Sequence, residues 1–167
     1  MGTFDQLLVT PMPPAEILLG KALPGFLVGT AEGTLIVIMA VFWFHVPFTG
    51  SLVGLYAGLL CFLFAAVGIG LMISSLAVTQ QQGLLGVFLF MVPAIVLSGF
   101  ATPIANMPQA VQYITLLDPL RYFLIVLRGS FLEGGDVSRF WPQYWPLLII
   151  GMACMITAAA LFRRRLA

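Results

Sequence analysis

The side chains that could do chemistry are few, and they are scattered along the sequence. Among 167 residues there are one histidine, two cysteines, seven basic and six acidic residues. His45 and the two cysteines, Cys61 and Cys154, lie in separate parts of the chain, so they form neither a metal-ligand cluster nor a Cys–His pair for nucleophilic catalysis. Ser98 precedes a glycine but lacks the GxSxG frame of a serine hydrolase. These residues predict that the chain is not an enzyme.

Nucleotide and nucleic-acid chemistry are also not expected from the sequence. No phosphate-binding loop of the form GxxxxGK[ST] occurs, so the chain is not expected to hold ATP in that way. A net charge of +1 argues against nucleic acid as a partner. We therefore expect no cofactor on this chain.

Glu32 is the one acidic residue in the middle of long apolar sequence. A carboxylate at membrane depth is costly unless it is protonated, paired or facing water. Three interpretations stay open: a protonated, hydrogen-bonded structural residue, a group that handles protons or substrate, or a residue in a span that sits shallower in the bilayer.

The elements that must position these residues are membrane helices. The chain is 61% hydrophobic and 8% charged, whereas a soluble domain carries about 25% charged residues. A soluble fold could not hide this much apolar surface, so the solvent is a bilayer. Four segments are long and apolar enough to cross it: residues 22–46, 51–78, 83–101 and 146–162.

The connections predict how these spans are arranged. Residues 47–50 and 79–82 are short polar or turn-forming joints, so the first three spans are expected to be antiparallel neighbours. Four spans place both termini on one side. Lys21 and the cluster Arg163–Arg165 lie on that side, and the positive-inside rule then predicts that both termini are cytoplasmic.

Small residues recur on the first two spans. Gly25, Gly29 and Gly33 lie four residues apart on the first span, with Glu32 on the same face. Gly54, Gly58 and Gly70 continue the pattern on the second span. Glycines at this spacing allow close approach of another helix. Both ordinary packing and a face that moves during transport remain open.

Prolines mark two further features. Pro93 interrupts the third span, where it frees a backbone carbonyl and forms either a packing kink or a gate hinge. Between the third and fourth spans, Pro108 can start a helix that runs to about Leu117. Asp118 as N-cap and Pro119 as first residue then start a second helix, which is too short to span. The pair predicts a re-entrant or interfacial hairpin.

Two motifs cover most of the chain. The first follows the pattern GT-x-(D/E)-x-LL-x-TP…E…(G/A)K through Gly2, Thr3, Asp5, Leu7, Leu8, Thr10, Pro11, Glu16, Gly20 and Lys21. The second follows LSG…P…MP…Q…P…YF…R…FL-x-G through Ser98, Gly99, Pro103, Met107, Pro108, Gln112, Pro119, Tyr122, Phe123, Arg128, Phe131, Leu132 and Gly134. With these motifs in this order, the chain resembles the C-terminal half of a type-2 ABC exporter permease.

The resemblance implies an all-α membrane protein that forms a single transmembrane permease domain. Four transmembrane helices are preceded by a cytoplasmic amphipathic coupling helix at Gly2–Pro11, and an external re-entrant helical hairpin at about 103–134 comes before the last span. Hairpin residues are expected to be Pro103, Met107, Pro108, Asp118, Pro119, Arg121 and Arg128. The location would be the bacterial inner membrane.

The resemblance also implies partners. The segment 2–21 would contact a separate ABC ATPase subunit, which would hold ATP-Mg, through Gly2, Thr3, Phe4, Asp5, Leu7, Leu8, Thr10, Pro11, Glu16 and Lys21. Phe4, Leu7 and Leu8 would form its apolar face. A second copy or homologue would complete a dimer, with the substrate passing at or near the dimer interface. The function implied is export, with this chain as the permease subunit.

The family pattern contains two further spans before the coupling helix, so we expect the sequence to be the C-terminal half of a longer protein. Two alternatives from other classes stay open: a proton-coupled small multidrug exporter that uses Glu32, and a non-transporting membrane scaffold. The long segment 102–141 argues against the first, because small multidrug transporters have short loops.

Overall fold

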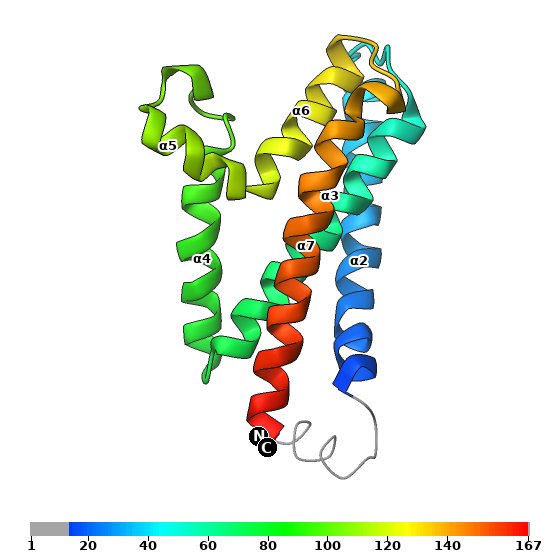
Figure 1. Ribbon diagram of the computed structural model, residues 1–167. Helices are drawn as coiled ribbons and strands as arrows, with labels where there is room; N and C mark the ends of the chain where they lie inside the picture. Colours follow the sequence, from blue (N-terminus) through cyan, green and yellow to red (C-terminus); the bar gives the residue numbers. More distant parts are fainter. Residues whose placement is uncertain (1–13, 167) are drawn as a thin grey trace.

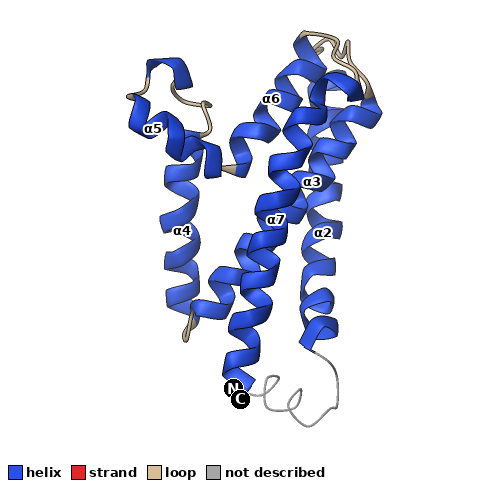
Figure 2. Cartoon of the chain, in the orientation of Figure 1, coloured by secondary structure: helices blue, strands red, loops and turns tan. Residues whose placement is uncertain are grey.

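The computed structural model describes residues 14–166, and these residues form helices and loops but no strand (Figure 2). The elements in order are α2 (Pro14–Ile38), the π-helical turn η1 (Met39–Trp43), α3 (Leu52–Leu76), α4 (Gln80–Leu97), the 3₁₀ turn η2 (Ile104–Asn106), α5 (Gln109–Ile114), the 3₁₀ turn η3 (Thr115–Leu117), α6 (Pro119–Leu132) and α7 (Val137–Leu166). The prediction of an all-α protein is confirmed for this part of the chain.

Within residues 14–166, four helices are long and apolar enough to cross a membrane. They are Leu19–Trp43, Leu52–Leu76, Gln80–Leu97 and Val137–Phe162. The start of α2 and the end of α7 lie at the same end of the bundle, which we call the terminal end (Figure 1). The opposite end carries α5, the end of α6 and the start of α7, and we call it the loop end. This arrangement agrees with the predicted even number of spans.

The last helix starts earlier than predicted. Residue 146 was expected to open the fourth span, but α7 begins at Val137 and includes both Pro142 and Pro146. Each proline removes one helical hydrogen bond. Burial offsets this cost, because Phe140, Tyr144 and Leu147, spaced by four and three residues along one face, are all buried.

The core lies where α3 meets α6 and α7. Two buried clusters form it: Ala65 with Tyr122 and Leu147, and Val126 with Phe140 and Tyr144. Glycines allow the close approach of the helices. A Cβ at Gly58 would lie 2.7 Å from Cγ1 of Val126, and one at Gly151 would clash with the Phe64 ring. The inner part of the fold is therefore α3, α6 and α7.

Helices α2 and α4 lie outside this core. In the most apolar window of each helix, the share of buried residues is 0% for α2, 6% for α4 and 33% for α3. Within α4, the buried residue is Ala94. The outer faces of α2 and α4 are thus available to lipid or to further protein.

Candidate functional site

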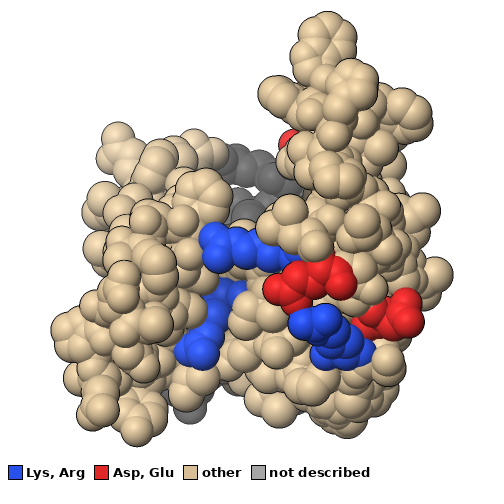
Figure 3. All heavy atoms as spheres, turned by 90° about the horizontal axis from the view of Figure 1, so that it is seen from above, with Lys and Arg blue, Asp and Glu red and all other residues tan. Residues whose placement is uncertain are grey.

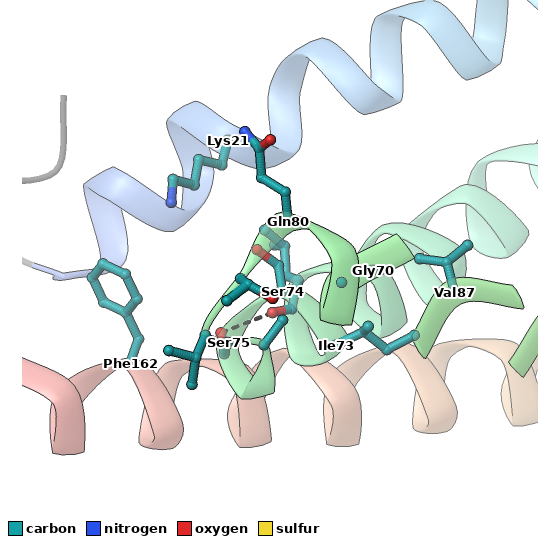
Figure 4. A pocket seen from close by; sticks show the side chains of 13 residues that line it. Lys21, Gly70, Ile73, Ser74, Ser75, Gln80, Val87 and Phe162 are labelled. Atoms are coloured by element: carbon teal, nitrogen blue, oxygen red, sulfur yellow. Dashed lines mark hydrogen bonds between the residues drawn. The ribbon is translucent and has the colours of Figure 1, made fainter. Parts of the chain in front are cut away.

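A cavity of about 450 Å³ opens at the terminal end, between the start of α2, the end of α3, the start of α4 and the end of α7 (Figure 4). Its polar lining residues are Lys21, Ser74, Ser75, Thr79 and Gln80. Residues close to chain joints supply most of them. Thr79 is the N-cap of α4, and its hydroxyl accepts a hydrogen bond from the backbone N–H of Gln82 at 3.2 Å. The short polar joint between α3 and α4 therefore forms part of the cavity wall.

Lys21 and Phe162 connect α2 to α7 at the mouth of this cavity. The ammonium nitrogen of Lys21 lies 5.6 Å from the centroid of the Phe162 ring, within the range of a cation–π interaction. Glu16 is exposed in the first turn of α2, where the helix dipole stabilises an acidic side chain. The other predicted coupling residues, 2–11, lie outside the described residues.

The glycine face of α2 lies against α3. A Cβ at Gly33 would lie 2.8 Å from Cδ2 of Leu59, a Cβ at Gly29 would clash with Leu63, and one at Gly25 would touch Val67 at 3.5 Å. A polar contact reinforces the pairing, because the Tyr56 hydroxyl donates to the Thr34 hydroxyl at 2.9 Å. The glycines of α2 thus lie in direct contact with side chains of α3.

Glu32 is exposed on α2 and forms no hydrogen bond or ion pair with another described residue. It therefore faces the surroundings of this chain, whether lipid, water or another protein segment. Its role stays a prediction.

The helix predicted to start at Asp118 and Pro119 is confirmed. The Asp118 carboxylate accepts the Leu120 N–H at 3.0 Å as N-cap, and Pro119 opens α6. Burial raises the pKa of the Asp118 carboxyl to about 6, although the Leu120 N–H and the charge of Arg121 act in the opposite direction. The first helix also reaches Leu117 as predicted, with its last turn in the 3₁₀ form of η3, but Pro108 is the N-cap of α5 rather than its first residue.

The helix α5 with η3 meets α6 at 87°, so the two form a sharply bent pair. Pro103 precedes η2, and the Met107 carbonyl accepts the Gln112 side-chain amide at 2.8 Å. These contacts fix the approach of the chain to α5. Pro93 lies inside α4 on an exposed face, one residue before buried Ala94.

Arginines hold the bent pair in place. Arg128 donates to the Gly99 carbonyl at 3.2 Å and so ties α6 to the chain after α4. Arg121 donates to the Thr115 hydroxyl and to the Gln112 carbonyl, which ties α6 to α5 and η3. Viewed from the loop end, side chains of both charges lie together near the centre of the surface, beside a hollow (Figure 3). The arginines here are structural ties as well as surface charges.

A second cavity of about 370 Å³ lies between α3, α4 and the start of α6. Its wall is almost entirely carbon, from residues such as Phe62, Ile69 and Phe90, with Asp118 at one edge. Neither cavity was anticipated from the sequence. The signal that could have pointed to them is Gly70, which was grouped with the packing glycines but has open space around it: a Cβ there would meet nothing within 4 Å.

The two cavities differ in their lining. One is open and partly polar at the terminal end, and the other is apolar and lies between α3, α4 and the start of α6. Within residues 14–166, no group of three histidine, cysteine or acidic side chains could hold a metal ion.

Comparison with known proteins gives one family. The family model described as "ABC-2 type transporter" matches residues 1–132. The chain is 40% identical over 164 residues to the "Probable multidrug ABC transporter permease YbhR" of Escherichia coli (strain K12), covering 98% of this chain and 45% of that protein. It is 34% identical over 164 residues to the "Inner membrane transport permease YhhJ" of the same strain, covering 98% and 44%.

A more distant relative is the "ABC transporter G family member 20" of Dictyostelium discoideum, 20% identical over 158 residues, which cover 93% of this chain and 21% of that protein. The chain spans a little under half the length of the bacterial relatives it matches. No solved structure matches it significantly.

Proposed function

The chain belongs to the ABC-2 type transporter family, and from that premise we propose that it forms the membrane permease part of an ATP-driven exporter. The observation that carries the proposal is the family match over residues 1–132, which includes the first three candidate spans and the bent α5–α6 pair. Relatives whose printed names are transport permeases, one of them a probable multidrug permease, support the same conclusion. ATP hydrolysis then belongs to a separate subunit, which carries ATP-Mg.

We propose that the ATPase contacts the segment 2–21. The described part of this segment supports a lever. Helix α2 extends from Pro14 to Ile38 and includes Pro24, which removes one helical hydrogen bond. A helix of 25 residues is about 37 Å long, so a push near Glu16 would reach the membrane part of the same helix.

The contact between α2 and α3 supports transmission of that push. Gly29 and Gly33 place the backbone of α2 directly against Leu63 and Leu59. Interlocked helices move together or slide along a defined face. Movement of the terminal end would thus reach α3, and through α3 the core with α6 and α7.

We further propose that both termini are cytoplasmic in the bacterial inner membrane. The bent α5–α6 pair would then be an external re-entrant hairpin. The exposed outer faces of α2 and α4 support a dimer with a second copy or homologue, since a large part of each helix surface is not covered by this chain. Substrate would pass at or near that interface.

The proposal is tested by co-purification of the full-length permease with its ABC ATPase in mild detergent. Leu8→Asp puts a charge on the predicted apolar face of the coupling helix. We expect it to remove the ATPase from the complex and with it ATP hydrolysis. The matched control is Leu132→Asp, because Leu132 is 70% exposed at the loop end.

The control should retain the ATPase. Full retention of the ATPase by Leu8→Asp, at unchanged permease yield, would contradict the proposal.

Glu32→Gln separates ATP-driven from proton-driven transport. If Glu32 carries protons, export of a cationic dye by reconstituted permease depends on the pH gradient and is lost in Glu32→Gln. Our proposal expects dye export to depend on ATP in both proteins.

A further inference from the structure

The two cavities along α3 and α4 are neighbours. Gly70, Ile73 and Val87 line both of them. The shared residues place the two cavities next to each other along α3 and α4, and we call the pair the α3–α4 groove. Figure 4 shows its terminal part, where the side chains of Lys21 and Gln80 and the ring of Phe162 surround the mouth.

The groove changes character along its length. At the terminal end it carries Lys21 together with hydroxyl and amide side chains. Among the described lining residues of this part, Lys21 is the one with a charge. Farther along α3 the wall becomes carbon, with Ile69 and Phe62 facing Phe90 across the groove. The groove is therefore polar at the end that carries Lys21 and apolar beyond it.

Its length fits one leaflet of a bilayer. Thirteen residues separate Ser75 from Phe62 on α3, which corresponds to about 20 Å along a helix. One leaflet contributes about 15 Å of hydrocarbon. An acyl chain that starts near Ser75 can thus stay in contact with the groove over its whole length.

We propose that the α3–α4 groove binds an anionic phospholipid of the leaflet at the terminal end, with its phosphate near Lys21 and one acyl chain along α3 and α4. Charge complementarity at the mouth selects the anionic headgroup, as basic pockets between membrane helices do. The apolar wall selects a hydrocarbon tail rather than a water-soluble anion.

Gly70 provides the most direct way to close the groove. It lines both cavities, and a Cβ there would meet nothing within 4 Å. Gly70→Leu should therefore fill the groove without disturbing the fold. Gly20→Leu is its matched control, because Gly20 is also a helical glycine with nothing within 4 Å but does not line either cavity.

The test is native mass spectrometry of the full protein in mild detergent, titrated with phosphatidylglycerol or with phosphatidylcholine of the same acyl chains. Wild type and Gly20→Leu should retain phosphatidylglycerol preferentially. Gly70→Leu displaces several methylenes of the chain and should weaken retention about tenfold or more. Lys21→Gln should weaken phosphatidylglycerol binding about fivefold, whereas Lys21→Arg should preserve it.

Thermal unfolding without added lipid provides the check on folding, and Gly70→Leu should unfold at the wild-type temperature. Retention of phosphatidylglycerol by Gly70→Leu at the wild-type level would overturn the proposal, as would equal binding of the two lipids by wild type. Inorganic phosphate that binds as tightly as phosphatidylglycerol would show a headgroup site to which the acyl groove contributes nothing, and it would also overturn the proposal. None of these results depends on export activity, so they are independent of the proposed transport function.

Discussion

The two ends of the bundle are built differently. At the loop end, hydrogen bonds join segments that are far apart in the sequence: Gly50 N–H to the Ser130 carbonyl at 2.9 Å, the Thr49 hydroxyl to the Phe131 carbonyl at 3.1 Å, and the Tyr144 hydroxyl to the Gly54 carbonyl at 2.8 Å. At the terminal end, the helices separate around a cavity of about 450 Å³. The loop end is therefore held together by hydrogen bonds between distant segments, whereas the terminal end contains open space between its helices.

This difference fits the work of a permease driven from one side. Tightly packed regions switch between discrete arrangements rather than deform gradually. An end held by hydrogen bonds can therefore transmit a movement, and an end with open space can accommodate one. A partner that acts on the terminal end would close or open the space around Lys21 while the loop end keeps its contacts. The predictions below test this contrast in order of expected size.

The largest effect is expected from adding a methyl group at the loop end. A Cβ at Gly50 would lie 2.6 Å from the carbonyl oxygen and 2.9 Å from the Cα of Ser130, which are backbone atoms that cannot rotate away. Gly50→Ala should therefore lower the free energy of unfolding by about 1–3 kcal/mol. Thermal unfolding in detergent measures it.

Gly70→Ala is the counterpart at the open end. Because a Cβ at Gly70 meets nothing within 4 Å, this variant should be neutral or gain up to about 1 kcal/mol from helix propensity. Equal losses in both variants would remove the contrast between the two ends.

A smaller effect is expected at the bend between η3 and α6. Asp118→Ala removes the N-cap bond to Leu120 and should cost about 1 kcal/mol, whereas Asp118→Asn keeps an acceptor. The measurement is the difference in unfolding free energy between the two variants. Identical stabilities would show that the cap does not hold the bend.

The same carboxyl predicts a pH dependence with a defined sign. Since the pKa of Asp118 rises from 3.8 to about 6 on folding, the native state binds its proton more tightly than the unfolded state does. The stability that this group contributes is present below 3.8 and is lost as pH rises through about 6. The wild type should therefore lose stability relative to Asp118→Asn across this window, and parallel pH profiles would contradict the prediction.

The smallest effect is expected from the surface pair at the loop end. Arg139 lies 2.5 Å from the Glu133 carboxylate, with both side chains more than half exposed. Exposed pairs contribute little, so Arg139→Gln should change stability by about 0.5 kcal/mol or less. A loss comparable to that of Gly50→Ala would mean that charges, rather than backbone contacts, hold this end.

The sequence predicts the number and type of helices because hydrophobic runs and capping residues are local signals. The helix α6 is an example: Asp118 as N-cap and the fourteen-residue, mainly apolar stretch that begins at Pro119 define it without tertiary information. The start of α7 was missed because the predicted span began at residue 146, whereas the burial of Phe140 and Tyr144 extends the helix back to Val137.

The candidate site was less predictable. Gly70 and Gly58 are both small residues on the same helix, yet Gly58 touches Val126 and Gly70 borders open space. Which of them packs depends on where α6 crosses α3, and the spacing of residues on α3 does not contain that information. The packing of the three glycines of α2 was easier to predict from the sequence, because all three lie on one face of one helix.

The central claim is that an ABC ATPase drives this chain from the terminal end. The most direct measurement is photo-crosslinking in intact membranes, with a photoreactive amino acid placed at Leu8 or, at the opposite end, at the exposed Leu132. We predict that the Leu8 position crosslinks to the ABC ATPase subunit and that the Leu132 position does not. Crosslinking to the ATPase from Leu132, or none from Leu8 in a membrane that exports actively, would contradict the claim.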